Sequence, residues 1–286
     1  MIIEQNRESA DALYQLARYL PITMGVMSEQ TQRLINTYLS VQDEIGPHRD
    51  AFMEMLKNIP DSSIDLIITD PPYDICCTGG GGNQGHKIST MGKDLVDLNI
   101  NTGYDIRKVG KEIVRVMKKM NVYFWCNKKQ IPEYFDFYVK EQGCKFDILT
   151  WNKTNPVPTY SNKYLTDTEY CLYFRNGGMC EPKNYEDAKT YWFDPINASD
   201  KQVWEHPTIK PQHMIEKLIR NSSKQGQLVM DLYLGSGTTA AACKKLNRNF
   251  IGSEINEKYY NIALKRVEET VQETEDEKSP LTEFFE

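Results

Sequence analysis

The sequence predicts an α/β fold in which a mostly parallel, twisted sheet is covered by helices on both faces. Short apolar runs, rich in β-branched and aromatic residues, alternate with amphipathic segments of helical period over most of the chain. Such alternation favours a parallel sheet, because a crossover helix can return the chain to the same edge. The 286 residues are 40% hydrophobic, which allows an extensive core.

The first part of the chain predicts a helical extension followed by the first strand. Residues 9–42 have the caps and apolar spacing of two helices. After a composition break at 45–47, a short helix leads to the apolar run 64–69, which predicts a buried strand. Residues 76–103 are rich in Gly, Asn and Ser without periodicity, and they predict a long loop.

The remaining elements follow in regular order. Ile106, Val109, Ile113 and Val116 lie on one helical stripe. Residues 176–208 are interpreted as irregular, and Pro211 opens a helix that Gly226 closes. The other expected elements are strands at 122–126, 146–151, 169–174, 227–233 and 249–253, and helices over about 132–142, up to about 246 and from Asn256.

Charge and cysteine content restrict the class of protein. The net charge of −6 is carried by residues 254–286, whereas residues 105–129 hold eight bases and two acids. Charge alone favours a solvated helix face for that basic run, because the sequence pI of about 5.4 is not typical of a nucleic-acid binder. The seven cysteines lack zinc-site spacing, so reduced thiols and no metal are expected. The absence of a long apolar run or secretory signal predicts a cytoplasmic protein without a membrane partner.

A glycine turn near the C-terminus predicts a cofactor site. Asp231 ends a strand, Gly235 and Gly237 form the turn, and the next strand ends at Glu254, 23 residues after Asp231. An acid at about that spacing reaches ribose hydroxyls in nucleotide-binding folds. The turn has no lysine of a phosphate-binding loop, which favours a ribose-bearing cofactor without phosphate. The alternative is an ordinary glycine turn, which the acid after the second strand disfavours.

The loop Asp70-Pro71-Pro72-Tyr73 is the more specific signal. It follows a predicted parallel strand, at the edge where open α/β sheets bind ligands. The prolines lack N–H groups and present carbonyl oxygens beside the Asp70 carboxylate, with an aromatic ring next to them. This arrangement suits a planar amine that donates hydrogen bonds to Asp70 and the Pro71 carbonyl while Tyr73 stacks on its ring. The alternative is a proline turn that only ends the strand.

Together, the DPPY loop and the later DLYLGSGTT loop resemble the DNA amino-methyltransferases. WNKTNPVP and HPTIKP agree with this resemblance, and the order of the two loops resembles the circularly permuted β group, a Rossmann-like fold. The resemblance covers about residues 46–270. It implies S-adenosyl-L-methionine as cofactor and double-stranded DNA as partner, with the target base flipped out into the site and covered by the loop 76–103.

The resemblance also implies roles for individual residues. The catalytic residues are Asp70, Pro71, Pro72 and Tyr73. Asp50 contacts the cofactor adenine, and Glu254 its ribose. The other cofactor-binding residues are Asp231, Leu234, Gly235, Ser236, Gly237, Thr238 and Thr239, with His206, Thr208 and Lys210 by analogy and Lys210 placed at the methionine carboxylate. Candidate DNA contacts are the basic run 107–129 and Lys163, Lys183, Lys189, Tyr185 and Tyr191.

Several alternatives stay open on the sequence. DPPY favours adenine N6 in this family, whereas SPPY usually accompanies cytosine N4, which is the nearest alternative. The others are a non-catalytic nucleic-acid binder and transfer to RNA or to a protein glutamine. A homodimer and a companion restriction endonuclease are both compatible with the resemblance. The expected units are a helical extension (1–45), a catalytic half (46–155), a target-recognition insertion (156–205), a cofactor-binding half (206–270) and an acidic tail (271–286).

Overall fold

A computed structural model describes residues 51–71, 104–156, 158, 162, 164–206, 209–254 and 256–273. The expected N-terminal helices and the loop 76–103 lie outside these residues. The described part forms one seven-stranded sheet in the order β5-β3-β4-β2-β1-β6-β7. Its strands are β1 (Leu66–Thr69), β2 (Met120–Cys126), β3 (Lys145–Lys153), β4 (Thr168–Asn176), β5 (Tyr191–Asp194), β6 (Leu228–Asp231) and β7 (Asn249–Gly252).

The sheet is mostly parallel, as expected. Strand β4 is antiparallel to both of its neighbours, β2 and β3, and the other four pairings are parallel. The helices are α3 (Ala51–Asn58), α5 (Ile106–Val116), α6 (Ile131–Phe135), the π-helix η2 (Asp136–Glu141), α7 (Tyr185–Ala188), α8 (Ala198–Trp204), α9 (Gln212–Ser222), α10 (Thr238–Lys245) and α11 (Glu257–Glu269).

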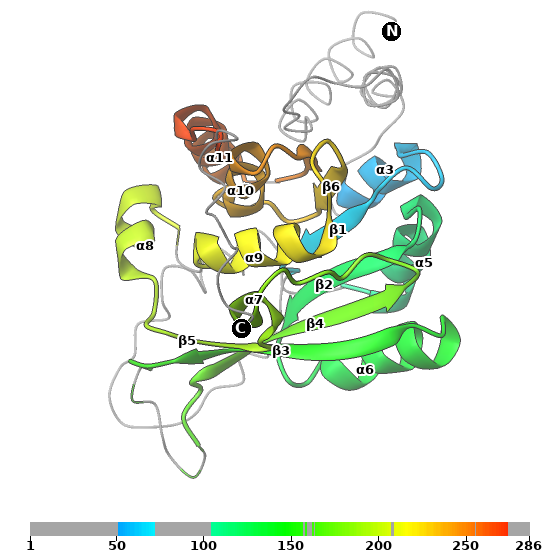
Figure 1. Cartoon of the computed structure of the whole chain (residues 1–286), viewed down its shortest axis with the longest axis horizontal. Coiled ribbons are helices and arrows are strands. Elements are labelled where there is room, and N and C mark those ends of the chain that lie inside the picture. The colour runs from blue at the N-terminus through cyan, green and yellow to red at the C-terminus, as the bar shows by residue number, and fades with distance from the viewer. Residues whose placement is uncertain are drawn as a thin grey trace, which may run out of the picture.

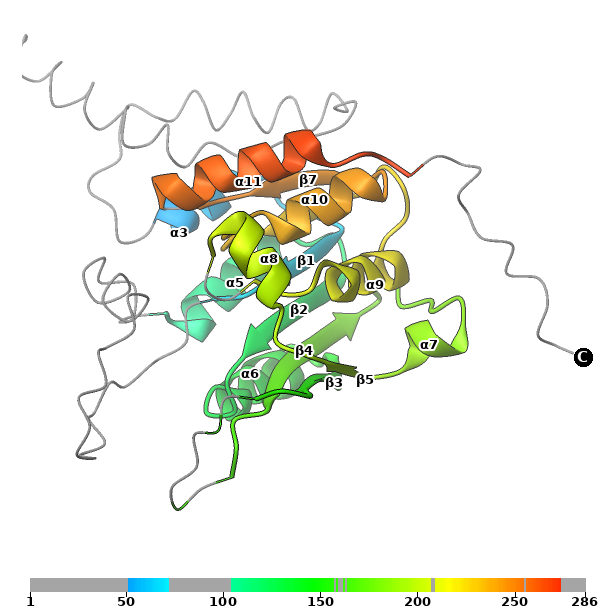
Figure 2. The ribbon, with the colours of Figure 1, turned by 90° about the vertical axis from the view of Figure 1, so that its left-hand side faces the viewer.

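Helices cover both faces of the sheet, which confirms the predicted fold class (Figures 1 and 2). Helices α3, α5, α6 and η2 pack on one face, and their apolar residues join one buried cluster with β2 and β4. Helices α9, α10 and α11 pack on the other face in a second cluster. Each central strand is therefore buried on both sides, as the continuous apolar runs predicted.

Local sequence accounts for helix α5, the next described element after β1. The four apolar residues expected on one stripe of α5 are all buried. The Asp105 carboxylate accepts hydrogen bonds from the backbone N–H groups of Arg107 and Lys108, which caps the helix at its first turn. This helix runs from the edge that bears the β1 loop back to the opposite edge of the sheet, because it connects two parallel strands.

The prediction that residues 176–208 are irregular is wrong. This segment contains α7, the edge strand β5 and α8. Asn184 and Asn197 cap the two helices by accepting hydrogen bonds from the N–H groups of Asp187 and Asp200. Only Trp192 of β5 is buried, because β5 is an edge strand that pairs with β3 alone. Short elements with so few buried residues give weak periodicity.

Two negative findings apply to the described ranges alone. None of their helices is long and apolar enough to cross a membrane. Their five cysteines, Cys126, Cys144, Cys171, Cys180 and Cys243, are free thiols, as expected.

Candidate active site

The two loops singled out in the sequence emerge side by side from the sheet. Strands β1 and β6 are parallel neighbours, with Leu66 opposite Val229 and Ile67 opposite Met230. Asp70 directly follows β1, and Asp231 is the last residue of β6. In the strand order, β2 lies beside β1 on the side away from β6, and β7 lies beside β6 on the side away from β1. The strand order therefore reverses between β1 and β6. Such a topological switch point is where open α/β sheets bind ligands.

Asp70 contacts a lysine from a third segment. The Lys210 ammonium donates a hydrogen bond to Asp70 Oδ2. Lys210 precedes α9, and its Nζ also lies 5.1 Å from the centre of the Trp125 ring at the end of β2. The Asp70 side chain is about one quarter exposed, whereas Lys210 is buried. Pro71 is buried beside it, and Pro72 and Tyr73 lie outside the described residues.

The glycine turn has the close packing that its sequence suggests. Gly235 and Gly237 have φ angles of +54° and +79°, in the region that favours glycine. A Cβ on Gly237 would lie 2.8 Å from Ala263 of α11, and a Cβ on Gly235 would lie 3.2 Å from His206 Nε2. The contact at Gly237 excludes a side chain, and the one at Gly235 would require the His206 ring to shift. The turn therefore brings α10 close to α11 and places His206 against Gly235.

Asp231 is buried at the base of this turn. Its carboxylate accepts hydrogen bonds from the Thr239 hydroxyl at 2.7 Å and the Tyr233 N–H at 3.1 Å. Burial and, to a smaller extent, the charge of Asp70 raise the pKa of Asp231 to about 7, although these hydrogen bonds lower it. A ligand with positive charge would favour the ionised carboxylate at this position.

Glu254 closes the other side of the turn. Its carboxylate accepts hydrogen bonds from the N–H of Gly235 at 2.7 Å and the N–H of Asn256 at 2.8 Å. Leu234, which is buried, donates its N–H to the Ser253 carbonyl and ties the turn to the end of β7. Each carboxylate oxygen can accept more than one hydrogen bond, so the two hydroxyls of a ribose are suitable donors to Glu254.

Two of the residues that the family resemblance placed at the cofactor, His206 and Lys210, lie at the site. The His206 ring lies beside Gly235 and packs against Tyr259, with 4.5 Å between ring centres. Burial lowers the pKa of His206 to about 4, and the charge of Lys210 contributes, so the ring is neutral at pH 7. Asp50 and Thr208 lie outside the described residues.

The site residues fit the cofactor that the resemblance implies. Asp231 and Glu254 supply two carboxylates around a turn that accommodates no side chain, which suits a ribose-bearing ligand with positive charge. Thr238 and Thr239 start α10, so the helix N-terminus also faces the turn.

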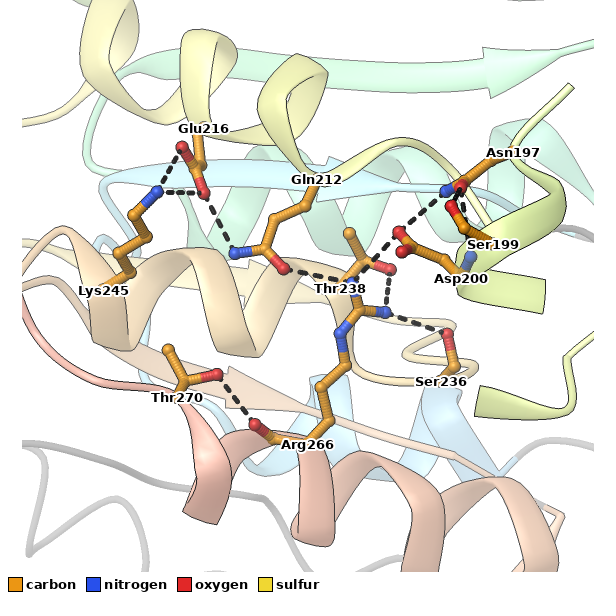
Figure 3. Close-up of polar contacts among 10 residues, drawn as sticks. All are labelled: Asn197, Ser199, Asp200, Gln212, Glu216, Ser236, Thr238, Lys245, Arg266 and Thr270. Atoms are coloured by element: carbon orange, nitrogen blue, oxygen red, sulfur yellow. Dashed lines mark hydrogen bonds and ion pairs between the residues drawn. The ribbon is translucent and has the colours of Figure 1, made fainter. Parts of the chain in front are cut away.

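Arg266 supports the glycine turn from below, and the sequence did not reveal it. From α11, its guanidinium donates to the Thr238 hydroxyl at 2.8 Å and to Gln212 Oε1 at 3.1 Å, and it lies 3.4 Å from the Ser236 hydroxyl (Figure 3). Asp200 of α8 lies 3.9 Å away. The side chain is buried, and burial lowers its pKa to about 10. The sequence signal that could have revealed Arg266 is its position on the same helical stripe as Ala263 and Val267, the buried apolar residues of α11.

Ion pairs within the protein neutralise several bases of the run 107–129, which begins on α5. Arg107 pairs with Glu141, Arg115 pairs with Asp61 and Glu112, and Lys118 pairs with Asp65. The last two bases lie toward the edge of the sheet opposite Asp70, because α5 runs away from the site. These pairs favour the structural interpretation of that part of the run.

Residues 156–205, the predicted target-recognition insertion, expose several aromatic side chains to solvent. Tyr185 is 78% exposed and Tyr191 is 44% exposed, and Phe193, two residues along β5, is 69% exposed. Lys189 Nζ lies 5.0 Å from the centre of the Tyr185 ring and also pairs with Glu186. Lys183 is exposed, and Lys163 lies outside the described residues.

A family model described as DNA methylase matches residues 64–265. The Type II methyltransferase M2.DpnII of Streptococcus pneumoniae is 31% identical over 249 residues, which cover 81% of this chain and 92% of that protein. M2.LlaDCHI of Lactococcus lactis subsp. cremoris is 30% identical over 247 residues, covering 80% and 91%.

Two solved structures have a similar fold. The M1.HpyAVI complex with S-adenosyl-L-methionine has a TM-score of 0.52 and 27% identity, and the match covers 77% of this chain and 98% of that one. The PvuII DNA methyltransferase, described as cytosine-N4-specific, has a TM-score of 0.55 and 17% identity over 75% and 83% of the two chains. At that identity the likeness concerns the fold alone.

Proposed function

This chain belongs to the DNA methylase family, and we propose that its acceptor is the N6 amino group of an adenine flipped out of double-stranded DNA. The chain is an enzyme that transfers a methyl group from S-adenosyl-L-methionine to DNA. The observation that supports a shared reaction site is the position of Asp70 and Asp231 at the ends of the neighbouring parallel strands β1 and β6.

The choice of adenine follows from the DPPY loop. Adenine N6 is a weak nucleophile because its lone pair is delocalised into the ring. Hydrogen bonds from N6 to the Asp70 carboxylate and the Pro71 carbonyl favour the pyramidal nitrogen that attacks, and Tyr73 stacks on the base. Asp70 also stabilises the positive charge that develops on N6 in the transition state. The bound cofactor supplies a methyl group already activated on a cationic sulfur.

The cofactor side is proposed on the same basis. Asp231 takes the amino group of the methionine part, and Glu254 takes the ribose hydroxyls. The turn 234–239, whose positive-φ glycines pack against His206 and Ala263, would hold the cofactor between these two carboxylates. Asp50 contacts the adenine, and His206, Thr208 and Lys210 surround the methionine end. These residues mainly position the two reactants, which is an effective contribution when the leaving group is already activated.

Target recognition is proposed for residues 156–205, which lie between the catalytic half (46–155) and the cofactor-binding half (206–270). The helical extension (1–45) and the acidic tail (271–286) flank these units. The support is the exposure of Tyr185 and Tyr191, since aromatic side chains exposed on a polar surface can stack on or insert between bases. A cytoplasmic location, a homodimer and a companion restriction endonuclease also belong to this proposal. The support for an endonuclease partner is that the relatives bear the name Type II methyltransferase.

The test compares the wild-type protein with Asp70→Ala. Unmethylated bacterial genomic DNA is incubated with each protein and the cofactor, hydrolysed, and its methylated nucleosides are identified by mass spectrometry. The wild type is expected to form N6-methyladenine, and Asp70→Ala is expected to lose more than a hundredfold in rate while DNA binding changes little. Formation of N4-methylcytosine instead would show that the acceptor is cytosine N4 and not adenine N6. Unchanged turnover in the variant would show that Asp70 takes no part in the mechanism.

A further inference from the structure

A partly buried ionic cluster adjoins Asp70 and involves two residues, Lys153 and Glu169, to which no role has been assigned. Glu169 lies in β4, and its Oε1 pairs with Lys153 Nζ of β3 at 2.6 Å. Its Oε2 pairs with Lys210 Nζ at 3.3 Å. Because Lys210 also contacts Asp70, the chain Lys153–Glu169–Lys210–Asp70 connects three strand ends at one edge of the sheet.

Pairing of the strands fixes Glu169 in this position. Strands β3 and β4 are antiparallel, with Trp151 opposite Glu169 and Asn152 opposite Thr168. The carboxyl end of β3 and the amino end of β4 therefore meet at the edge where β1 ends. Lys153 reaches across from β3, and its Nζ also lies 5.2 Å from the centre of the Trp151 ring.

The charges in the cluster show which carboxylate anchors the lysines. Burial raises the pKa of Glu169, but the charges of Lys210 and Lys153 outweigh burial, so the pKa lies below its ordinary value and Glu169 is ionised at neutral pH. Lys201 of α8 is near enough that the charges of Lys153 and Lys210, after burial, lower its pKa. Three lysines thus lie around the half-buried Glu169 carboxylate, and loss of its charge would increase the repulsion among them.

Lys210 needs such an anchor because a lysine side chain is flexible. Its four-carbon stem carries about 2 kcal/mol of rotamer entropy, and its ammonium is a point charge without a fixed fork geometry. The Trp125 ring under the ammonium and the Glu169 carboxylate beside it restrict where the charge can lie. An ammonium held in one place also holds the Asp70 carboxylate, whose terminal torsion is otherwise broad.

We propose that Glu169 is a positioning residue for methyl transfer: it holds the Lys210 ammonium beside Asp70, and Lys210 in turn fixes the orientation in which Asp70 receives the acceptor amine. This inference rests on the proposed function. Glu169 acts through Lys210 and does not itself have to touch either reactant. Misplacement of a positioned group by about 1 Å can cost on the order of a hundredfold in rate.

The first test is Glu169→Gln, which keeps the size of the side chain and removes its charge. Transfer of tritiated methyl groups to unmethylated bacterial genomic DNA is measured at saturating cofactor and DNA, and cofactor affinity is measured by calorimetry. The variant is expected to lose tenfold or more in kcat, whereas the Kd for S-adenosyl-L-methionine, whose methionine end Lys210 also faces in the proposed function, should rise by a smaller factor. A kcat within twofold of the wild type would overturn the inference.

Asp65→Asn is the matched control. Asp65 also pairs with a lysine, Lys118 at 2.9 Å, and its side chain is only 10% exposed, but it lies at the opposite edge of the sheet from Asp70. Loss of its charge should lower the melting temperature without changing kcat. An equal loss of kcat in both variants would mean that Glu169 acts on stability alone, and this would also overturn the inference.

A double-mutant cycle separates action through Lys210 from an independent effect. Lys210→Met should slow transfer by itself, and adding Glu169→Gln should then change kcat less than twofold. Multiplication of the two single effects would contradict the inference. If Glu169→Gln does not fold, Glu169→Asp replaces it: the shorter carboxylate should reduce kcat several-fold with a smaller change in cofactor affinity. A wild-type kcat would count against the inference.

The wild-type reaction distinguishes the two proposals. If the wild-type protein transfers no methyl group to DNA, the proposed function fails, and this inference fails with it. If the wild type is active and Glu169→Gln is equally active, the proposed function stands and the inference alone is wrong.

Discussion

Gly237 combines two constraints at the start of α10. Its φ of +79° disfavours any side chain, and a Cβ would lie 2.8 Å from both Cα and Cβ of Ala263. Gly237→Ala is therefore expected to destabilise the protein by roughly 2 to 4 kcal/mol, of which about 1 kcal/mol is backbone strain and the rest overpacking. Urea unfolding measures the loss. Cofactor affinity should fall as well, because α11 pushes the turn away from its position.

Gly226→Ala provides the control for backbone strain. Gly226 has a similar φ of +77°, but nothing lies within 4 Å of the position of its Cβ. This variant should lose about 1 kcal/mol and keep the wild-type cofactor affinity. Equal losses of stability in the two variants would show that the contact with Ala263 carries no cost, contrary to the packing described for α10 and α11.

Among the elements, Arg266 links four helices at the glycine turn. It lies on α11, donates to Thr238 of α10 and Gln212 of α9, and faces Asp200 of α8. Arg266→Met keeps much of the apolar stem but leaves buried hydrogen-bond acceptors without their donor. We expect a loss of roughly 2 to 4 kcal/mol in the free energy of unfolding and about tenfold weaker binding of S-adenosyl-L-methionine, measured by urea unfolding and calorimetry.

Arg107→Met tests whether the loss of any arginine would have the same effect. Arg107 pairs with Glu141, but both side chains are nearly half exposed, and such pairs contribute little to stability. Cofactor affinity should be unchanged in this variant. If Arg266→Met also keeps the wild-type affinity, then Arg266 joins the helices without supporting the turn.

The elements differ in how far the sequence could predict them. The central strands and α5 were predictable because they are buried on one stripe or on both faces, which gives strong periodicity. Strand β5 was not, because only Trp192 of its four residues is buried and its pairing partner, β3, lies far away in sequence. The asparagine caps of α7 and α8 were visible signals, but helices of four and seven residues show little period.

At the scale of the whole molecule, topology explains why the two loops could be predicted to meet. Both follow strands of a parallel sheet, and parallel strands end at the same edge. The contact between Glu169 and Lys210 joins a side chain of β4 to one from the segment before α9. No rule of sheet topology predicts that these two segments, which are 41 residues apart, meet. An acid directly before the apolar run 170–174 of β4 was the signal that Glu169 offered.

The charge of the molecule is unevenly distributed, and this gives a prediction for DNA binding. The chain has a net charge of −6, and residues 274–286 contain five acids and one lysine. Removal of these residues keeps Glu273, which pairs with Lys245, and changes the net charge from −6 to −2. Binding of an unmethylated DNA duplex should become several-fold tighter at 50 mM salt, because long-range repulsion between the protein and the phosphates is reduced.

Salt separates this effect from a direct contact. The distance over which salt screens exposed charges falls from about 10 Å at 0.1 M to about 3 Å at 1 M. The affinities of the full chain and the shortened chain, measured by fluorescence anisotropy, should therefore converge as the salt concentration rises. A ratio of affinities that stays constant between 50 and 500 mM salt would show that residues 274–286 act by a short-range contact, and repulsion by their net charge would then be the wrong explanation.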